Sequence, residues 1–356
     1  MAWSTPRDWT AGEVLSAANM DTYVSDNLTH LYDVRFGAGR RNVLTNSHFD
    51  IWQRGTSFTP ASSTKTYAAD RWCAYRVGTT GCTVSRQTGP TGQQYAMRVQ
   101  RDSANSSTTA IQVFQGVDTA DSLRMAGATT AQLKLTLKAG ADFSATTSNV
   151  TVKVTTGTGT NESPTASWTG EADALSTSQA ITTSAVTYDF DSITIPSSAT
   201  QVKVQVSFAP TGTASTNDWF EISGAQLSVG SSPTMERLSQ AQTLAECQRY
   251  YYQWGPWGTE EVVGNASNYS TTLAICVLRF PVTMRAQPTV TFSAVTDFQV
   301  AANGGTANST NVTGAKASTA SVRMDITCVG LGAGQGSLVD NNADTTNAAI
   351  YVTAEI

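Results

Sequence analysis

Alternation of apolar and polar residues over the middle of the chain most limits the possible folds. Segments such as "YAMRVQRD", "AQLKLTLKAG", "NVTVKVTT" and "TQVKVQVSFAP" carry apolar side chains at alternate positions. Successive side chains of a strand point to opposite faces, so each segment buries one face and exposes the other. Glycine, proline, asparagine, serine or aspartate separates the segments. The pattern therefore predicts an antiparallel sandwich of about eight to ten strands, the size of a jelly roll.

The same pattern divides the chain into three regions. Residues 1–40 are helical in pattern, residues 41–237 form the jelly roll, and residues 238–356 begin with a helical join in which Leu238, Ala241 and Leu244 share a face. Strand-like segments such as "STTLAICVLRFPVTM" and "NAAIYVTAEI" follow. The predicted fold is mainly β: an antiparallel jelly-roll sandwich followed by a smaller C-terminal β-sandwich, with a short N-terminal helical segment.

An apolar stripe with helical spacing lies in the first region. Ser16 can cap the helix, and the stripe recurs every three or four residues at Ala17, Met20, Val24, Asn27 and Leu31. The stripe can pack on its own domain, or it can form a seam between identical chains or a plug into a larger assembly. Both interpretations stay open, and a polar member such as Asn27 can set the register of a seam.

Low charge content excludes several classes of partner. Charged residues make up 14% of the chain, and the net charge is −5, so we expect no binding of nucleic acid or of an anionic membrane surface. No apolar run approaches the roughly 20 residues needed to span a bilayer, and the N-terminus lacks the pattern of a secretory signal. We therefore expect synthesis in a cytosol and five free, mostly buried cysteines, with a Cys73–Cys82 disulfide as the alternative.

Catalytic motifs are not evident. Only two histidines, His30 and His48, are present, and no metalloprotease, nucleophile-elbow, phosphate-loop or CxxC pattern occurs. Two carboxylate pairs are candidates for a glycosidase site, because two carboxylates can hydrolyse glycans. A position on a solvated face or at a strand end is the simpler explanation for each pair. These pairs are Asp189 with Asp191 and Asp218 with Glu221.

A calcium ion is a further alternative for this domain. Jelly rolls often hold calcium with hard oxygen ligands, which Asn46, Asp50 and Glu221 would supply if the first and last strands are neighbours. Hydrogen bonds in turns and at strand edges are the simpler role for these residues. We predict no catalytic residue and no cofactor.

Aromatic residues give the best binding candidates. Trp72 and Trp219 lie in strand patterns and are expected in the core, and Trp52 in the core or at a domain interface. Trp168 lies in a polar loop without evident burial, where it can stack on a sugar ring. The run "YYYQWGPWG" can form an exposed platform or pack between domains or subunits. The predicted glycan-binding residues are Trp168, Tyr251, Trp254 and Trp257.

Several segments together resemble proteins of bacteriophage particles. "RNVLTNSHFDIWQRGTSFT" followed by "YAADRW" resembles the opening strands of a domain found in many phage tail and tail-fibre proteins. "FEISGAQLSVGSSPTMERLSQAQTLAECQRYYYQ" resembles the close of that domain, and "FPVTMRAQPTVTFS" is similar to the C-terminal β-domain that follows it. "PRDWTAGEVLSAANMDTYVSDNLTHL" resembles a segment at the start of many phage structural proteins. Residues 77–217 match only in general character.

The resemblance implies a non-enzymatic virion structural protein, usually a homotrimer, whose jelly roll resembles carbohydrate-binding modules. The N-terminal segment would attach it to other virion proteins. The expected function is that of a tail fibre or receptor-binding protein that attaches the particle to host surface glycans. It would be made in the host bacterial cytoplasm and located in the virion, without nucleic acid or membrane insertion. Alternatives are a capsid-decorating or head/collar fibre protein with a purely structural role and, third, a polysaccharide depolymerase.

Overall fold

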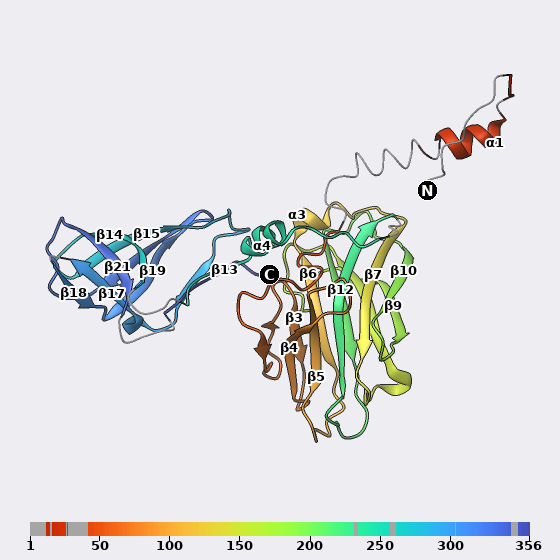
Figure 1. Ribbon diagram of the computed structural model, residues 1–356, viewed down its shortest axis with the longest axis horizontal. Coiled ribbons are helices and arrows are strands. Elements are labelled where there is room, and N and C mark those ends of the chain that lie inside the picture. The colour runs from red at the N-terminus through yellow and green to blue at the C-terminus, as the bar shows by residue number, and fades with distance from the viewer. Residues whose placement is uncertain are drawn as a thin grey trace.

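The structure is a computed structural model of the 356-residue chain. It describes residues 12–14, 16–25, 27, 42–230, 234–256, 261–302, 304–342 and 348–356. The described chain is mainly β, and its strands form four antiparallel sheets that lie in two groups along the sequence (Figure 1).

Two six-stranded sheets form the jelly roll. The first sheet has the order β1 (Ser57–Phe58), β4 (Cys82–Thr88), β5 (Tyr95–Arg101), β12 (Trp219–Val229), β7 (Ala131–Ala139) and β10 (Val186–Ile193). The second has the order β2 (Thr66–Tyr67), β3 (Cys73–Arg76), β6 (Ile111–Val117), β11 (Gln201–Phe208), β8 (Asn149–Gly157) and β9 (Ala172–Ala180). Neighbouring strands are distant in sequence, as in β12 between β5 and β7, which is the crossing connectivity of a jelly roll.

The alternating side chains explain why the two sheets pack together. On β7, Leu133, Leu135 and Leu137 are fully buried in one core that both sheets share. Each such side chain contributes roughly 1.5–3 kcal/mol by leaving water. Trp72 belongs to this core, with its ring centroid 5.0 Å from that of Phe49. The alternation predicted from sequence is thus the pattern that builds the core.

The structure differs from two expectations that were drawn from the sequence. Residues 42–56, expected to open the domain as a strand, form turns and irregular structure, because Asn46 and Phe49 adopt left-handed backbone (φ 52° and 58°) that ends any strand. Trp219, expected in the core, is buried but lies outside the core cluster. Its neighbour Phe220 faces the core, so the period of two directs the indole to the outer face of the first sheet.

A second group of strands forms the C-terminal domain. Its seven-stranded sheet has the order β18 (Gly305–Asn308), β17 (Phe298–Ala302), β21 (Gly336–Asn341), β14 (Val262–Asn268), β15 (Leu273–Arg279), β20 (Ser321–Thr327) and β19 (Asn311–Ala317). A three-stranded sheet has the order β13 (Tyr251–Trp254), β22 (Ile350–Thr353) and β16 (Thr289–Phe292). The smaller sheet contributes Ile350 and Val352 to a core that is separate from that of the jelly roll.

The two edge strands of the seven-stranded sheet are consecutive in the chain. Strands β18 and β19 lie at opposite edges, yet only Ser309 and Thr310 separate them in the chain. The Ser309 amide donates to the Phe298 carbonyl (3.0 Å), and the Thr310 amide donates to the Thr327 carbonyl (2.8 Å). One bent segment therefore links the two edge strands of the sheet, although β18 and β19 do not pair with each other.

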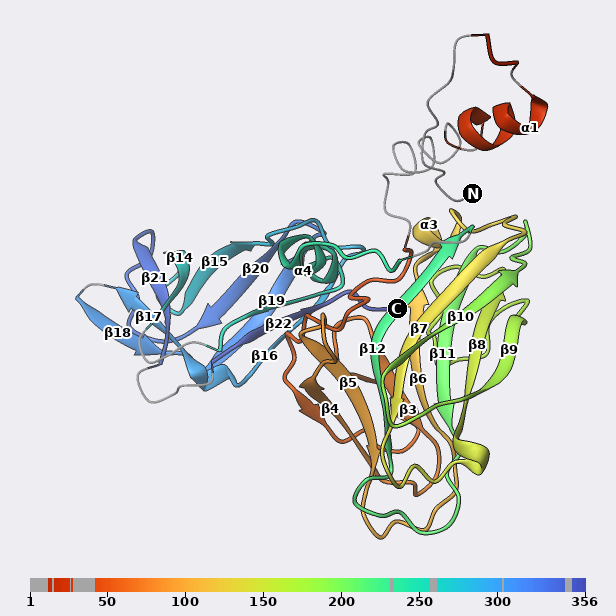
Figure 2. The same ribbon diagram turned by 45° about the vertical axis from the view of Figure 1, so that its right-hand side comes forward.

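Helix α4 (Gln240–Gln248) connects the two domains (Figures 1 and 2). Ser239 caps it through a capping box with Gln242. The predicted face is correct only in part: Leu238 and Leu244 are half-buried and Ala241 is exposed, whereas Thr243 and Cys247 are the buried positions. Short helical turns are α3 (Thr119–Ser122), η2 (Thr146–Ser148) and η3 (Val295–Asp297).

The N-terminal helix α1 (Ala17–Met20) continues as a π-helical turn, η1 (Asp21–Ser25). The predicted cap is confirmed, because the Ser16 hydroxyl accepts from the Asn19 amide at 3.2 Å. Of the predicted stripe, Ala17 and Met20 are exposed, Val24 is half-buried, and the buried Asn27 donates to the Tyr23 carbonyl (3.2 Å). Leu31 lies outside the described residues.

Candidate functional site

Trp168 is not exposed. Its exposed fraction is 5%, its indole Nε1 donates to the Ser163 carbonyl (2.9 Å), and the Lys203 ammonium lies 4.5 Å from its ring centroid. The loop folds back onto the second sheet at Gly157, where a Cβ atom would lie 3.1 Å from the indole. The expectation of an exposed stacking face is therefore wrong for Trp168, because the missing side chain at residue 157 makes room for the ring.

Tyr251 and Trp254 lie on β13, beside the jelly roll. Tyr251 is 6% exposed, and the Arg54 guanidinium covers its ring at 3.6 Å from the centroid. Burial raises the pKa of Tyr251 to about 12. Trp254 is half-buried, with its ring 5.6 Å from that of Phe280. Packing at the domain junction, the alternative left open from the sequence, is the observed role of Tyr251. Trp257 lies outside the described residues.

Charged side chains hold this junction. The Glu355 carboxylate accepts from Arg54 (3.1 Å) and from Arg71, both in the jelly roll. The Arg71 guanidinium also lies 3.6 Å from the ring centroid of Tyr250, whose hydroxyl donates to Asp118 (2.7 Å). Burial alone would lower the pKa of Arg71, but the Glu355 carboxylate raises it above its ordinary value. Paired buried charges and stacked rings thus join the two domains.

Backbone groups near residue 356 add to the junction. Lys65 and the Tyr67 hydroxyl (3.0 Å) donate to the Ile356 carbonyl. The Ala354 amide donates to the Tyr250 carbonyl at 2.7 Å, within the C-terminal domain. Gln53 bridges the domains, since its amide nitrogen donates to both Asp70 and the Tyr251 carbonyl (2.9 Å). These contacts set one relative orientation of the domains.

Other side chains of the protein bind both candidate carboxylate pairs. Asp218 pairs with Arg101 (3.0 Å), and both side chains are fully buried. Glu221 accepts from two nitrogens of Arg98, at 2.7 and 2.9 Å. The other pair binds across the sheet to β7, with Asp189 on Lys134 (2.7 Å) and Asp191 on Gln132. Cations and amides of the protein itself therefore bind all four of these carboxylates.

The three candidate calcium ligands do not converge. The Asn46 side chain bonds the Ile51 amide and carbonyl and the Asp70 carbonyl, at 2.9–3.0 Å. Asp50 lies 3.6 Å from Arg237, and Glu221 is bound to Arg98. Among the described residues, no group of three or more histidine, cysteine or acidic side chains could hold a metal ion.

The thiols and the described histidine are held in their neutral forms. All five cysteines are free and buried, which confirms the sequence expectation. Burial raises the pKa of Cys73 and that of Cys82 to about 12, so neither forms a thiolate at neutral pH. Burial and then the nearby Arg237 lower the pKa of His48 to about 4. A Cys73–His48 nucleophile pair is thus unsupported, and His30 lies outside the described residues.

The loop end of the jelly roll consists of loops 102–110, 140–148 and 209–218. These loops lie at the ends of the strands away from α4 (Figure 2). One buried guanidinium joins all three: Arg101 donates to Asp218, to Ser144 (3.3 Å) and to the carbonyls of Asn105 (2.6 Å) and Gly212 (2.6 Å). The sequence held one signal of this, since alternation places Arg101 on the same face as the core residues Met97 and Val99.

Neutral polar groups cover the loop end. Its exposed side chains are mainly hydroxyls and amides, from Ser103, Ser106, Thr108, Thr146, Thr213, Ser215, Thr216 and Asn217, with Asp102 and Asp142 as exposed charges. Ala104 and Thr147 are held in left-handed backbone (φ 64° and 56°), which costs about 1 kcal/mol or more per residue. The loops are therefore fixed rather than free, and their groups can exchange hydrogen bonds with a hydroxylated ligand.

Comparisons with known proteins show general likeness in fold. The sequence matches no protein-family model and no curated protein. A CBM4 structure is 17% identical over 51% of this chain and 97% of its own, with a TM-score of 0.32. The enzymatically active domain of tailspike protein 4 of bacteriophage CBA120 is 10% identical over 45% of this chain and 19% of its own, with a TM-score of 0.31. A cyclase from Fischerella sp. is 10% identical over 54% of this chain and 98% of its own, with a TM-score of 0.33.

These likenesses carry no argument about function. The identities are low, the TM-scores are well below 0.5, and the three structures include a cyclase as well as a CBM4 protein. A shared fold supports unrelated activities. In the part of the chain that the structure describes, no helix is long and apolar enough to cross a membrane.

Proposed function

We propose that this chain is a bacteriophage virion protein, a tail fibre or receptor-binding protein that attaches the particle to host surface glycans. The observation that carries the proposal is the loop end of the jelly roll, where Arg101 fixes three loops that present hydroxyl and amide groups. The order of phage-like sequence segments supports the virion role.

A fixed polar surface suits a glycan for two reasons. Sugar hydroxyls both donate and accept hydrogen bonds, as do the serine, threonine and asparagine side chains of the loop end. Loops that are already ordered lose little further entropy on binding, which leaves more of the contact energy as affinity. Residue 43 enters the jelly roll beside Leu227, at the opposite end of β12 from these loops. Attachment through the N-terminal segment would therefore leave the loop end accessible.

The proposal includes no chemical step. Each candidate carboxylate is bound by protein cations or amides, as described above, so a depolymerase has less support than a binding protein. A halo on a host lawn produced by the purified chain would reverse that order.

The proposal also includes assembly through residues 1–40 and a homotrimer. The exposed Ala17 and Met20 would then contact other virion proteins or other copies of the chain. The solution mass of the full chain and of residues 41–356 tests this. A trimer that survives the truncation places the subunit interface in the β-domains, and monomers in both forms contradict the homotrimer.

A glycan array tests the binding function. The full chain should bind host-type glycans, and Thr146→Ala combined with Thr213→Ala should weaken binding several-fold by removing two exposed hydroxyls of the loop end. Ser176→Ala combined with Ser178→Ala, two exposed hydroxyls of the edge strand β9, is the matched control and should bind unchanged. No array signal for the full chain would overturn glycan binding. Immunogold labelling of particles separates a tail location from a capsid-decorating one.

A further inference from the structure

The far end of the C-terminal domain is built from two loops that we call the rim, residues 269–272 and 328–335. Strand β15 leads from the first loop to residue 285, whose amide donates to the Arg249 carbonyl beside α4 (2.7 Å). The rim therefore lies at the opposite end of β15 from the domain junction. In Figure 1 the seven-stranded sheet extends away from the jelly roll.

Backbone hydrogen bonds hold the two rim loops to each other. Four such bonds run between them and the adjoining residue Asn268: Cys328 amide to Thr272 carbonyl (3.1 Å), Leu331 amide to Thr271 carbonyl (3.2 Å), Gly334 amide to Asn268 carbonyl (2.8 Å) and Asn268 amide to Gln335 carbonyl (2.8 Å). Leu331 and Cys328 are buried beneath them. The rim is thus an ordered surface.

Two large apolar side chains face water on this ordered surface. Tyr269 is 73% exposed and Val329 is 71% exposed. Burial of an aromatic ring is strongly favourable, so a ring held open on a fixed loop is available for a partner. The hydroxyls of Thr271 and Thr272 are exposed beside it, and that of Ser270 is half-buried.

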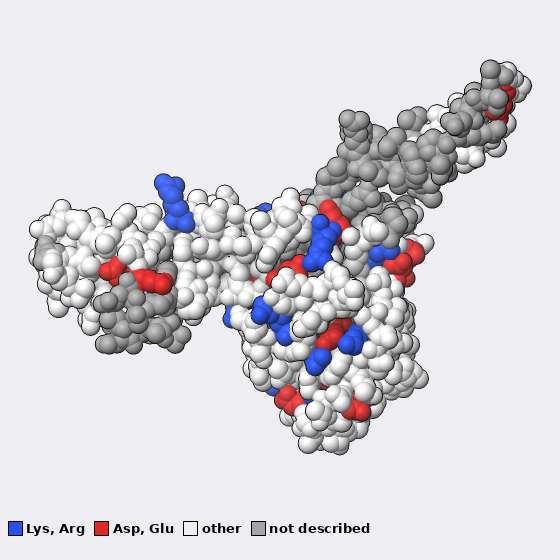
Figure 3. All heavy atoms as spheres, in the orientation of Figure 1, with Lys and Arg blue, Asp and Glu red and all other residues white. Residues whose placement is uncertain are grey.

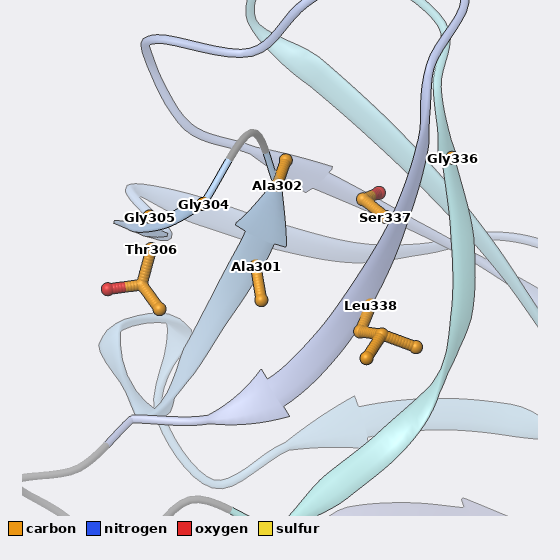
Figure 4. A pocket seen from close by; sticks show the side chains of 8 residues that line it. All are labelled: Ala301, Ala302, Gly304, Gly305, Thr306, Gly336, Ser337 and Leu338. Carbon is orange, nitrogen blue, oxygen red and sulfur yellow. The ribbon is translucent and has the colours of Figure 1, made fainter.

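A shallow groove of about 640 Å³ lies next to the rim. Figure 4 shows that mostly small side chains and one leucine line it. They come from β17 (Ala301, Ala302), the following Gly304, the start of β18 (Gly305, Thr306) and β21 (Gly336, Ser337, Leu338). The Ser337 hydroxyl donates to the Asn268 Oδ1 (2.8 Å). The Nδ2 of the same buried Asn268 has no hydrogen-bond partner among the described residues. A groove of this volume suits a small ligand.

The charges beside the rim are an internally paired couple: Arg323, which lies within electrostatic range of Tyr269, is bound by Asp325 on the same strand at 2.6 Å. Residues 262–278, 300–315 and 328–339 contain no lysine, arginine, aspartate or glutamate, and Figure 3 shows few charged side chains on the visible face of this domain. Anionic polymers and lipid headgroups are bound through cations, and the Arg323 guanidinium near the rim already donates two hydrogen bonds to Asp325. A stable protein interface buries about 800 Å² per partner around an apolar centre, whereas the rim loops 269–272 and 328–335 expose Tyr269 and Val329 beside hydroxyls and glycines.

We propose that the rim and its groove form a second binding surface, which takes a neutral saccharide chain. The Tyr269 ring stacks on the apolar face of one sugar, and the groove accepts the adjoining sugar, with the Ser337 and Thr306 hydroxyls among its lining groups. This surface lies in a different domain from the loop end. The choice of a saccharide as its ligand rests on the proposed function.

The experiment is affinity electrophoresis of the full chain in gels that contain a neutral glucan, galactan, mannan or xylan. Tyr269→Ala removes the stacking ring, and Gly336→Gln fills the groove. The added Cβ at residue 336 meets no atom within 4 Å, and the backbone there is not left-handed, so the fold is retained. Val262→Ala, at the other end of β14 and 58% exposed, is the matched control.

We expect at least one polysaccharide to retard the full chain and both rim variants to weaken that retardation at least tenfold. The Val262→Ala variant and the loop-end double variant should still bind at the rim. If both rim variants are retarded as strongly as the original chain, the rim proposal is overturned. If only the loop-end variant loses retardation, the rim proposal is likewise overturned, but the proposed function stands. No retardation by any of the four polysaccharides also overturns the rim proposal, whereas the glycan array tests the proposed function independently.

Discussion

Single side chains decide how this β-rich protein keeps its loops in place. Arg101 and Asp218 are both fully buried, and the guanidinium also bonds carbonyls of two loops. Taking two charges out of water is costly, and only a complete set of partners offsets that cost. His48 follows the same rule by staying neutral in its buried position.

Asp218→Asn should lower the free energy of unfolding by about 3–5 kcal/mol, because it leaves the buried Arg101 charge without its counterion. Asp189→Asn removes the partner of Lys134, but Asp189 is 46% exposed, so its loss should cost about 1 kcal/mol or less. Urea unfolding measures both. Equal effects of the two changes would show that Arg101 does not depend on its counterion.

The His48 ring should make the protein less stable as the pH falls. Its folded-state pKa of about 4 lies below the ordinary value of 6.5, so the unfolded chain binds the proton more readily. Stability is therefore complete above pH 6.5 and declines from there to about pH 4, by roughly 1–3 kcal/mol. His48→Gln should remove this decline in unfolding midpoints measured across that range. Parallel curves for the two proteins would contradict the assignment.

At the scale of elements, close contacts between neighbouring strands fix the sheets. Gly140 follows β7, and its amide donates to the Trp219 carbonyl at the start of β12 (2.7 Å). A Cβ at residue 140 would lie 2.0 Å from the Asn217 carbonyl oxygen and 2.8 Å from the Trp219 indole. Here glycine is required because backbone and an indole occupy the space of a side chain.

Gly140→Ala should lower the free energy of unfolding by about 2 kcal/mol or more, because the strand must move away from β12. Gly336→Ala is the control, since its Cβ would meet nothing within 4 Å, and surface changes of this kind usually stay within about 0.5 kcal/mol. Urea unfolding of both variants tests the contact. A Gly140→Ala variant as stable as the original chain would contradict it.

Across the whole molecule, the junction makes the two domains one unit. Glu355 is the only residue of the C-terminal domain that the structure shows bound to both Arg54 and Arg71. Each domain has its own hydrophobic core, so the junction and not a shared core couples them. A fixed junction would hold the rim and the loop end at a constant separation, as a particle-bound attachment protein needs.

Glu355→Gln should uncouple the domains, because the buried Arg71 guanidinium loses its carboxylate at a cost of about 3 kcal/mol or more, and the half-buried Arg54 loses its link to the C-terminal domain. Scanning calorimetry should then show two transitions in place of one. Asp325→Asn is the control, because its Arg323 partner lies on the same strand β20, away from the junction. A single unchanged transition for Glu355→Gln would show that the junction does not couple the domains.

Sequence reasoning succeeded where a local pattern decides the structure. The alternation of "AQLKLTLKAG" gave β7 and its buried leucines, and Ser16 gave the cap of α1. Burial of Trp168 and Tyr251 could not be predicted from a local pattern. The side chains that cover the two rings, Lys203 and Arg54, are distant in sequence. Exposure of Tyr269 likewise depends on how two remote loops meet. Polar sequence around an aromatic residue therefore did not indicate an exposed ring.

The central claim, that this chain attaches a phage particle to its host, is tested most directly by competition for adsorption. Host cells are incubated with increasing amounts of the purified full chain before phage is added, and the unadsorbed particles are counted. The account predicts a saturable loss of adsorption, which disappears when excess host surface polysaccharide is added with the protein. Unchanged adsorption at a concentration of folded protein that saturates the glycan array would contradict the account.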